Sequence, residues 1–133
     1  MARFAYRCAL RWSDMDVYGH VNNARFLTLY EEARVAMMFT GAREAGVTSL
    51  EDGVVISRHE VDYLRPVDYG DPVRIELWVS EVRPSRFTVA YELIDREVVA
   101  SRALSVCVPF NLEGQYPRRL SEAERAFLAD WVE

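Results

Sequence analysis

The stretch Ala24–Phe39, ARFLTLYEEARVAMMF, carries the one long helical pattern of the chain. Its apolar side chains recur every three or four residues, which is the spacing of one face of an α-helix. That face consists of Phe26, Tyr30, Ala33 and Met37. The rest of the stretch has few polar residues, and a helix that is apolar on nearly all sides is typically buried. The stretch therefore predicts one buried helix around which the remaining chain folds.

Segments of alternating apolar and polar residues lie on both sides of this helix, and a period of two predicts β-strands. The expected strands are Phe4–Leu10, Val54–Leu64, Val73–Val82, Phe87–Ile94 and Val98–Phe110. Short turns between consecutive strands favour antiparallel pairing, and only the long helix is apolar enough to cover such a sheet. The spacing of Ser121 and Glu124 is that of a capping box and predicts a short C-terminal helix. We expect a single α+β domain spanning 1–133, with a five-stranded antiparallel sheet wrapped around the helix.

The composition limits the function classes. The chain has 133 residues and a net charge of −5, and half of its residues are hydrophobic. An acidic balance argues against nucleic-acid binding, which needs a basic face. No apolar run reaches the roughly 18–20 residues of a membrane span, and the first residues lack the apolar stretch of a signal peptide. We therefore expect a cytoplasmic protein with no membrane or nucleic-acid partner.

Two motif blocks carry a family resemblance. The first is DMDVYGHVNN at Asp14–Asn23 followed by YEEAR at Tyr30–Arg34, and the second is VDYLRP at Val61–Pro66 followed by YGDPV at Tyr69–Val73. Together they resemble the hot-dog-fold acyl-CoA thioesterases of the 4-hydroxybenzoyl-CoA thioesterase family. The resemblance implies a hot-dog fold and hydrolysis of an acyl-CoA thioester to the free acid and CoA. The run HVNN is also similar to acyl-carrier-protein thioesterases, a branch of the same fold.

Thioester hydrolysis needs an activated water or a nucleophile, and donors for the oxygen that becomes negative. The first motif ends where a helix begins, and the free N–H groups and dipole of a helix start create a positive potential. The resemblance implies that Asp16 is the catalytic carboxylate, that the backbone N–H of Asn23 is the oxyanion donor, and that His20 assists catalysis or positions the substrate. The sequence leaves open whether Asp16 attacks the carbonyl carbon or activates water. Asp14 and Asp16 could each cap a turn instead, and we expect this structural role for Asp14.

Substrate contacts are expected in two places. Tyr18 stands where the carrier-protein branch has an asparagine, and we expect it to contact substrate. The turn Arg83–Arg86 is the most concentrated positive turn among the strands. Related thioesterases hold the CoA phosphates with basic residues near the corresponding turn, and arginine suits phosphate geometry. Arg83, Ser85 and Arg86 are therefore candidates, and a solvated hairpin is the competing interpretation.

No metal or cofactor is expected. Asp14, Asp16 and His20 could ligate a metal ion, but three ligands in one short loop without a remote partner make a poor site. The resemblance also implies a reaction that needs no cofactor.

Assembly is expected from the exposed sheet. A lone sheet leaves strand edges unpaired. The expected outer face also carries more apolar residues than a solvated face would. Those residues are Ile56, Leu64, Trp78, Val106 and Val108. The resemblance implies dimers that continue the sheet across subunits, with the active site at the interface. We expect a homodimer at least, and a dimer of dimers as the full assembly.

Two other functions stay open. One is hydrolysis of an acyl-carrier-protein thioester, which the HVNN run suggests. The other is a non-catalytic acyl-CoA-binding hot-dog module. A binding module has no need for a carboxylate beside the helix start, so the role of Asp16 separates it from an enzyme.

Overall fold

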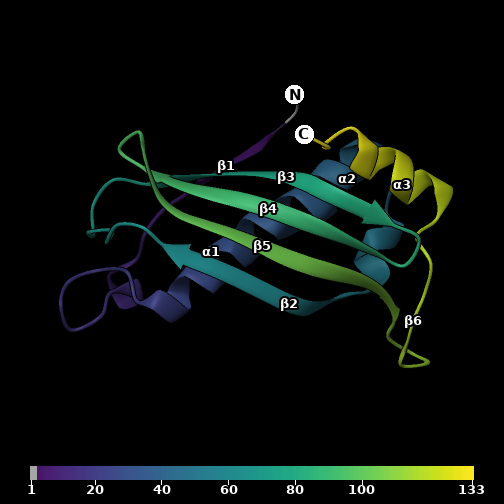
Figure 1. Ribbon diagram of the computed structural model, residues 1–133, viewed down its shortest axis with the longest axis horizontal. Coiled ribbons are helices and arrows are strands. Elements are labelled where there is room, and N and C mark those ends of the chain that lie inside the picture. The colour runs from purple at the N-terminus through teal and green to yellow at the C-terminus, as the bar shows by residue number, and fades with distance from the viewer. Residues whose placement is uncertain (1–2) are drawn as a thin grey trace.

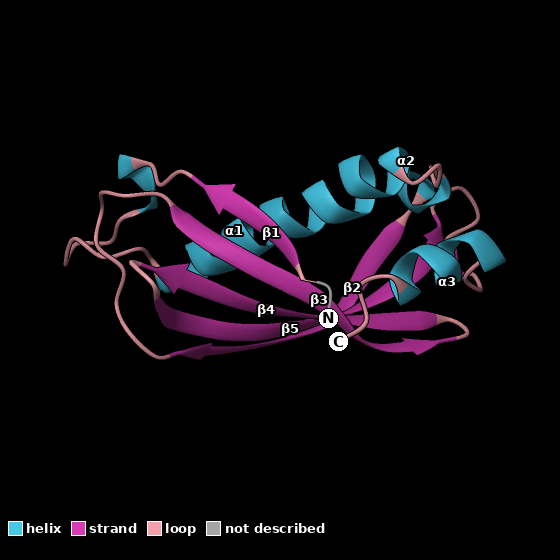
Figure 2. Ribbon diagram, turned by 90° about the horizontal axis from the view of Figure 1, so that it is seen from above, coloured by secondary structure: helices cyan, strands magenta, loops and turns pink. Residues whose placement is uncertain are grey.

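The computed structural model describes residues 3–133 as an antiparallel sheet curled around one long helix (Figure 1). The strands follow the order β1-β3-β4-β5-β2, and the short β6 pairs with β5. The elements are β1 Phe4–Cys8, α1 Asn23–Val35, α2 Ala42–Glu44, β2 Val54–Tyr63, β3 Val73–Arg83, β4 Arg86–Asp95, β5 Val98–Asn111, β6 Tyr116–Pro117 and α3 Glu122–Ala129. Figure 2 shows α1 running along one side of the sheet. The expected hot-dog fold is confirmed, and β6 is an addition to it.

The long helix extends further than the sequence predicts. After α1 the chain continues through a π-helical stretch, Ala36–Gly41, into α2. The sequence predicts an end at Phe39 because a glycine at position 41 is typical of a helix break. In the structure Gly41 serves close packing, because a Cβ at this position would lie 3.1 Å from the ring of Phe4. The helix ends near Gly46, whose φ of 84° suits a left-handed helix end.

The predicted apolar face of the helix forms the centre of the core. Phe26, Tyr30, Ala33 and Met37 are all buried, and they pack with inward-facing strand residues such as Leu77. Burying one large side chain of this kind stabilises the fold by about 1.5–3 kcal/mol. The opposite side of the helix is not buried as expected: Glu31 and Glu32 are exposed, and Val35 retains 41% of its surface. In the single chain the helix therefore covers the sheet with one face only.

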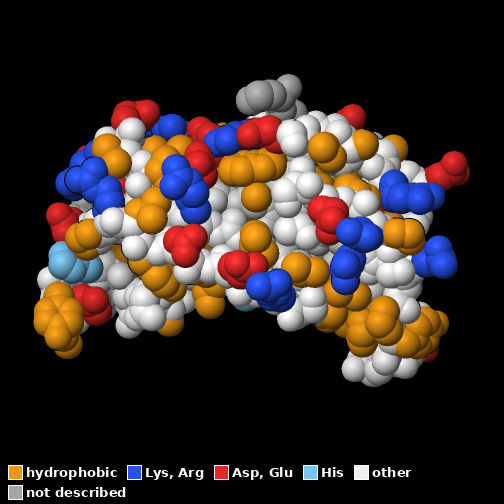
Figure 3. All heavy atoms as spheres, in the orientation of Figure 1, with side chains coloured by type: hydrophobic (Ala, Val, Ile, Leu, Met, Phe, Trp, Pro, Cys, Tyr) orange, Lys and Arg blue, Asp and Glu red, His pale blue; other side chains and the backbone are white. Residues whose placement is uncertain are grey.

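The outer face of the sheet mixes apolar side chains with charged ones of both signs (Figure 3). Arg3 pairs with Glu76 and Glu92 there, and its guanidinium lies 3.9 Å from the centre of the Trp78 ring. Such a contact is favourable because the face of an aromatic ring attracts a cation. Trp78, Val106 and Val108 are half-buried, so charged neighbours cover part of the apolar surface that the sequence predicts on this face.

A chain of polar groups runs from the buried Arg34 on α1 through the core to His59, an exposed residue on the edge strand β2. Arg34 Nη1 donates to the Tyr91 hydroxyl over 2.9 Å, and that hydroxyl donates to Ser105 Oγ over 2.9 Å. Ser105 Oγ lies 2.8 Å from Nδ1 of His59. Burial and the nearby Arg34 guanidinium lower the pKa of His59. Each buried group thus has a partner, as interior polar groups require.

The C-terminal helix is held by the predicted capping box. Ser121 Oγ accepts from the Glu124 N–H, and the Glu124 carboxylate accepts from the Ser121 N–H. Glu124 is fully buried and also accepts from Arg118 and from the hydroxyl of Ser49. Burial alone would raise the pKa of Glu124, but the hydrogen bonds from Arg118, Ser121 and Ser49 together lower it to about 2. This cluster ties α3 to the short helical turn before β2.

The edge strand β2 departs from simple alternation. The register between β2 and β5 shifts between Ile56 and Arg58, which marks a β-bulge. Because one extra residue inverts the alternation, Ile56 turns inward and packs against the core, contrary to the prediction that it lies on the outer face. Within residues 3–133, the outer edge of β2 pairs with no other strand. No helix in this part of the chain is long and apolar enough to cross a membrane.

Candidate active site

Asp16 lies in a tight turn that its own carboxylate organises. Asp16 Oδ1 accepts hydrogen bonds from the N–H groups of Tyr18 (2.8 Å) and His20 (3.1 Å). The Asp16 N–H donates to the His20 carbonyl oxygen over 2.7 Å, and Gly19 supplies the left-handed residue with a φ of 78°. Asp16 Oδ2 accepts no hydrogen bond from residues 3–133. Asp16 therefore caps a turn and still keeps one carboxylate oxygen open.

The start of α1 lies beside this turn. Asn22 is the N-cap, and its Oδ1 accepts from the Ala24 N–H over 2.9 Å. The N–H of Asn23 has no acceptor among the described residues, so it remains available to a ligand. The Tyr63 hydroxyl, at the end of β2, donates to the Asn23 carbonyl oxygen over 2.8 Å. The hydrogen bond from Tyr63 thus connects the first turn of the helix to the sheet, while the N–H of Asn23 stays free.

A cavity of about 330 Å³ brings these groups together. It is lined by Asp16, His20, Val21, Asn23, Phe26, Tyr63, Leu64, Arg65 and Pro66. Three residues singled out in the sequence, Asp16, His20 and Asn23, therefore share one cavity. The lining also includes residues that the sequence did not single out, chiefly Tyr63, whose ring packs edge-on against Phe26 at 5.1 Å. Most of them belong to the second motif block, Val61–Pro66, which lies next to the first block in the structure. Membership of this block was the only indication in the sequence that they contribute to the site.

The second motif block also holds His20. His20 forms an isolated antiparallel bridge with Asp68, and its Nε2 lies 3.5 Å from Asp68 Oδ1. The Val21 N–H donates to the Val67 carbonyl oxygen over 2.8 Å. Asp68 was not predicted, because the sequence around it indicates only a turn. The two loops thus fix each other's position at the mouth of the cavity.

Asp14 has the structural surroundings expected for it. It is 1% exposed, its Oδ2 accepts from the Arg11 N–H over 2.9 Å, and the Arg25 side chain lies 3.9 Å from its Oδ1. It does not line the cavity. Asp14 closes the short 3-10 helix Trp12–Asp14 that precedes the Asp16 turn.

With this geometry in place, the similarity to known proteins is specific. The family model of the thioesterase-like superfamily matches residues 10–132. The chain belongs to the thioesterase-like superfamily. Because its relatives are named as CoA hydrolases and thioesterases, the expected class of enzyme is confirmed.

Relatives of this thioesterase-like chain agree in fold and in class. A 1,4-dihydroxy-2-naphthoyl-CoA hydrolase of Synechococcus elongatus is 30% identical over 100% of this chain and 97% of that protein. A predicted thioesterase from Bacillus stearothermophilus superposes with a TM-score of 0.86 at 27% identity, covering 99% of this chain and 98% of that one. A thioesterase from Thermus thermophilus, solved with coenzyme A and Zn, has a TM-score of 0.76 and 32% identity over 93% and 90% of the two chains. The expected family is confirmed at the level of the superfamily, since the named hydrolase acts on a dihydroxynaphthoyl thioester rather than a hydroxybenzoyl one.

The other expected substrate contacts of this thioesterase lie away from the cavity. Tyr18 is 80% exposed at the tip of the Asp16 turn and does not line the cavity. The turn with Arg83, Ser85 and Arg86 joins β3 to β4 at the opposite end of the sheet (Figure 1). The strand β3 begins beside Cys8 at the site's end and runs about 30 Å to this turn. A single chain therefore does not bring these residues to Asp16, and Arg83 instead pairs with Glu81 at 3.1 Å.

The metal hypothesis has no further support in this thioesterase. Within residues 3–133 no group of three or more His, Cys, Asp or Glu side chains is arranged to hold a metal ion.

Proposed function

We propose that this chain hydrolyses an acyl-CoA thioester to the free acid and CoA, with Asp16 as the catalytic carboxylate. The observation that carries the proposal is that the open oxygen of Asp16 and the unpaired N–H of Asn23, both among residues 3–133, belong to residues of one cavity. Relatives named as CoA hydrolases and a thioesterase solved with coenzyme A support CoA as the leaving group.

The geometry suits the chemistry of the reaction. A thioester carbonyl oxygen placed at the helix start accepts from the Asn23 N–H, which stabilises the oxyanion as the carbonyl carbon becomes tetrahedral. Asp16 either takes a proton from the water that attacks this carbon, or attacks it directly and is released by water. In both routes the C–S bond breaks, and the CoA thiolate receives the proton that water gives up. His20 lines the same cavity as Asp16. This supports a role for His20 in assisting that proton transfer.

The test is release of free thiol from a panel of acyl-CoA substrates with short, long and aromatic acyl groups. Asp16→Asn should lower kcat by at least about 100-fold, the usual range for a lost acid–base group. Asp130→Asn, an exposed aspartate after α3, is the matched control and should keep the wild-type rate. A wild-type protein that cleaves no acyl-CoA, or an Asp16→Asn protein at full rate, would refute the proposal.

The same panel separates the alternatives. Faster cleavage of acyl-carrier-protein thioesters than of acyl-CoA would favour the carrier-protein activity that HVNN suggests. Tight binding of acyl-CoA without any turnover would favour the non-catalytic module. The open oxygen of Asp16 favours an enzyme, because it leaves a carboxylate oxygen available to substrate or water in the cavity.

We further propose that the protein acts as a homodimer joined along β2, and that two dimers pair into a tetramer. The edge of β2, unpaired within residues 3–133, and the one-sided burial of α1 support a second copy at this edge. A two-fold axis there would bring the Arg83–Arg86 turn of one copy to the end of the sheet that holds Asp16 in the other. The candidate phosphate contacts Arg83, Ser85 and Arg86 would then act across the interface. Light scattering measures the assembly, and an exclusively monomeric active enzyme would contradict it.

A further inference from the structure

The chain carries a short arm that projects past the edge strand of the sheet. The arm consists of residues 111–117, which run from the end of β5 through β6, and it stands beyond the start of β2 (Figure 1). Its two large apolar side chains, Leu112 and Tyr116, each keep 52% of their surface exposed. Apolar side chains gather on the lobe at this corner, at the lower right of Figure 3. The arm therefore presents an apolar surface at one end of the β2 edge.

Hydrogen bonds and close packing hold the arm in one shape. Asn111 Oδ1 accepts from the Gly114 N–H over 2.7 Å, and Asn111 Nδ2 donates to the Tyr116 hydroxyl over 3.0 Å. A Cβ at Gly53, just before β2, would lie 2.9 Å from the Leu112 side chain, so glycine lets the arm approach closely. Because the arm is preformed, a partner that binds it has little ordering entropy to overcome.

A second apolar surface lies at the other end of the same edge. Tyr63, the last residue of β2, and Leu64 keep 47% and 48% of their surface exposed. The N–H groups of Leu64 and Arg65 both donate to the Ala100 carbonyl oxygen, which fixes this end to β5. Tyr63, Leu64 and Arg65 also line the cavity that holds Asp16. A partner that covers this surface therefore covers one side of that cavity.

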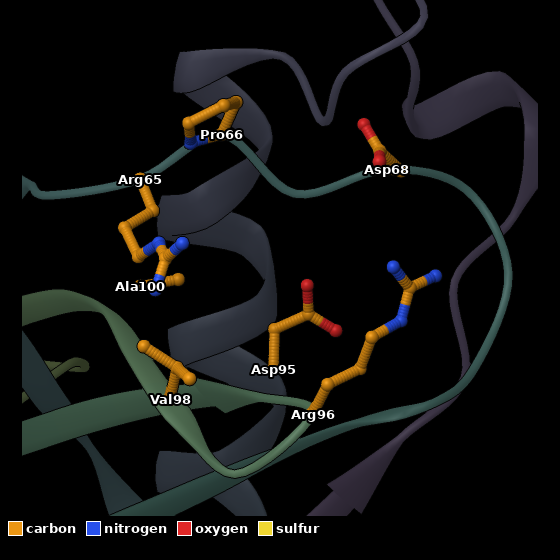
Figure 4. A pocket seen from close by; sticks show the side chains of 7 residues that line it. All are labelled: Arg65, Pro66, Asp68, Asp95, Arg96, Val98 and Ala100. Atoms are coloured by element: carbon orange, nitrogen blue, oxygen red, sulfur yellow. The ribbon is translucent and has the colours of Figure 1, made fainter.

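The two surfaces carry opposite charges. Glu113 on the arm and Arg65 after β2 are both exposed, and neither side chain forms an ion pair or hydrogen bond with the part of the chain that the structure describes. Figure 4 shows the Arg65 side chain turned away from Asp68. The ten residues of β2 separate the two ends by about 30 Å, so Glu113 does not reach Arg65 of its own chain.

A second copy of the chain fits both surfaces at once. The outer edge of β2 pairs with no strand among the described residues. Two such edges pair antiparallel across a two-fold axis, which sets the start of one β2 beside the end of the other. One register sets Val54 opposite Tyr63 of the second copy, and Ile56 opposite Val61. All four side chains then share the inner face, because Val54, Ile56 and Val61 pack against the core and Tyr63 packs against Phe26.

We propose that the arm of each copy packs on the end of β2 of a second copy and forms one wall of that copy's active-site cavity. The two apolar side chains of the arm cover Tyr63 and Leu64. Glu113 pairs with Arg65 at the rim and helps to set the register. A lipid surface or an unrelated protein would not need the two surfaces at opposite ends of one unpaired strand. This inference rests on the proposed homodimer along β2, and it adds that each site is completed by the other chain.

The first test reverses the charges of Glu113 and Arg65. Glu113→Arg and Arg65→Glu should each raise the dissociation constant of the dimer about tenfold, because like charges then meet at both contacts. The double variant should return to within about threefold of the wild type. Since the two residues of one chain lie about 30 Å apart, only contact between copies produces this rescue. Sedimentation measures the constant, and Glu122→Arg, on an exposed glutamate of α3, is the matched control.

A double variant as weak as the single variants would overturn the proposal. So would single variants that dissociate no more readily than the wild type.

The second test asks whose site the arm serves. Leu112→Ser should raise KM for acyl-CoA about fivefold where the protein is dimeric, since the cavity loses part of a wall. Mixed dimers with Asp16→Asn, isolated through different tags on the two chains, hold an intact Asp16 beside an intact arm from the other chain. Their KM should return to the wild-type value. If the arm served its own chain, every intact Asp16 would keep the altered arm, and KM would stay raised.

The outcomes separate the arm from the proposed function. If the wild type cleaves no thioester but the charge reversal is rescued, the thioesterase function fails and the contact between copies stands. An active wild-type dimer whose mixed dimers keep the raised KM refutes the arm alone. An active wild-type monomer refutes the dimer and the arm together.

Discussion

Asp16 and Glu124 lie at opposite ends of the molecule, and both carboxylates accept hydrogen bonds from backbone N–H groups. Asp16 lies in the turn before α1, and Glu124 lies in the first turn of α3, yet the two are used differently. Both oxygens of Glu124 are occupied, by Arg118, Ser49 and the Ser121 N–H, and the side chain is fully buried. Within residues 3–133 only Oδ1 of Asp16 is occupied, and the other oxygen is free at a cavity. Glu124 is fixed in the fold by both of its oxygens, whereas Asp16 is held by one oxygen and keeps the other for the catalytic role proposed above. The number of carboxylate oxygens that accept hydrogen bonds, rather than the position relative to a helix, distinguishes Asp16 from Glu124.

The largest effect should come from neutralising each carboxylate. Glu124→Gln leaves Arg118 without its charged partner and should lower the free energy of unfolding by about 2–3 kcal/mol, with kcat per folded molecule unchanged. Asp16→Asn should lower kcat and leave the free energy of unfolding nearly unchanged. The amide oxygen can still accept hydrogen bonds from Tyr18 and His20, but the negative charge proposed to act in catalysis is gone. Denaturant unfolding and thiol-release kinetics on both variants check this. A stability loss at Asp16 as large as that at Glu124 would erase the distinction.

Acid should expose the same contrast. Hydrogen bonds overcome the effect of burial and lower the pKa of Glu124 from 4.5 to about 2. A group whose pKa is lower in the folded state stabilises the fold fully above its unfolded pKa, and this stabilisation is lost as the pH falls toward the folded value. The free energy of unfolding should therefore decline between pH 4.5 and about 2, and this part of the decline should be absent from Glu124→Gln. An identical acid profile in wild type and variant would show that Glu124 is not the group responsible.

A smaller effect is expected from the tyrosine that anchors the site end of the helix. Tyr63→Phe removes the hydrogen bond to the Asn23 carbonyl oxygen, a contact worth about 1 kcal/mol. If this contact orients the oxyanion donor, kcat should fall about fivefold while KM changes little. Tyr116→Phe, which removes an exposed hydroxyl at β6, is the control. A change confined to KM would assign Tyr63 to substrate binding instead.

The smallest effects come from two glycines with nearly the same conformation. Gly19 and Gly46 have φ angles of 78° and 84°, and a Cβ would meet no atom within 4 Å at either position. Alanine at each should lower stability by about 1 kcal/mol for the same backbone reason. Only Gly19→Ala should also lower kcat, because only Gly19 shapes the turn that holds Asp16. An equal kcat in Gly19→Ala and Gly46→Ala would show that the Asp16 turn can change its backbone conformation without affecting catalysis.

The sequence predicts the parts of this molecule that depend on local periodicity. The buried face of α1, the succession of strands along the chain and the capping box at Ser121 follow from patterns within one segment. The outward placement of Ile56 failed because a bulge adds one residue to β2, and nothing in the local alternation marks it. The helix end at Phe39 failed because Gly41 serves contact with Phe4, a residue far away in the sequence.

The candidate site divides in the same way. Asp16, His20 and Asn23 are close in sequence, and their common cavity could be predicted from one motif. Tyr63 lines that cavity and Asp68 holds His20 at its mouth, and both arrive through long-range pairing that no single segment encodes. The Arg83–Arg86 turn lies at the opposite end because strands alternate in direction, so successive hairpin tips point to opposite ends of a sheet.

The polar chain from Arg34 to His59 has a consequence for how the strands find their alignment. A slip of β5 by two residues against its neighbours would keep every apolar side chain on the correct face, so hydrophobicity alone does not penalise it. Such a slip would put Ala103 or Cys107 where Ser105 now bridges Tyr91 and His59. The buried Tyr91 hydroxyl would then lose its acceptor, at a cost of about 1–3 kcal/mol. The buried hydrogen bonds therefore favour the native strand register over a register shifted by two residues, even where the apolar packing of the two is similar.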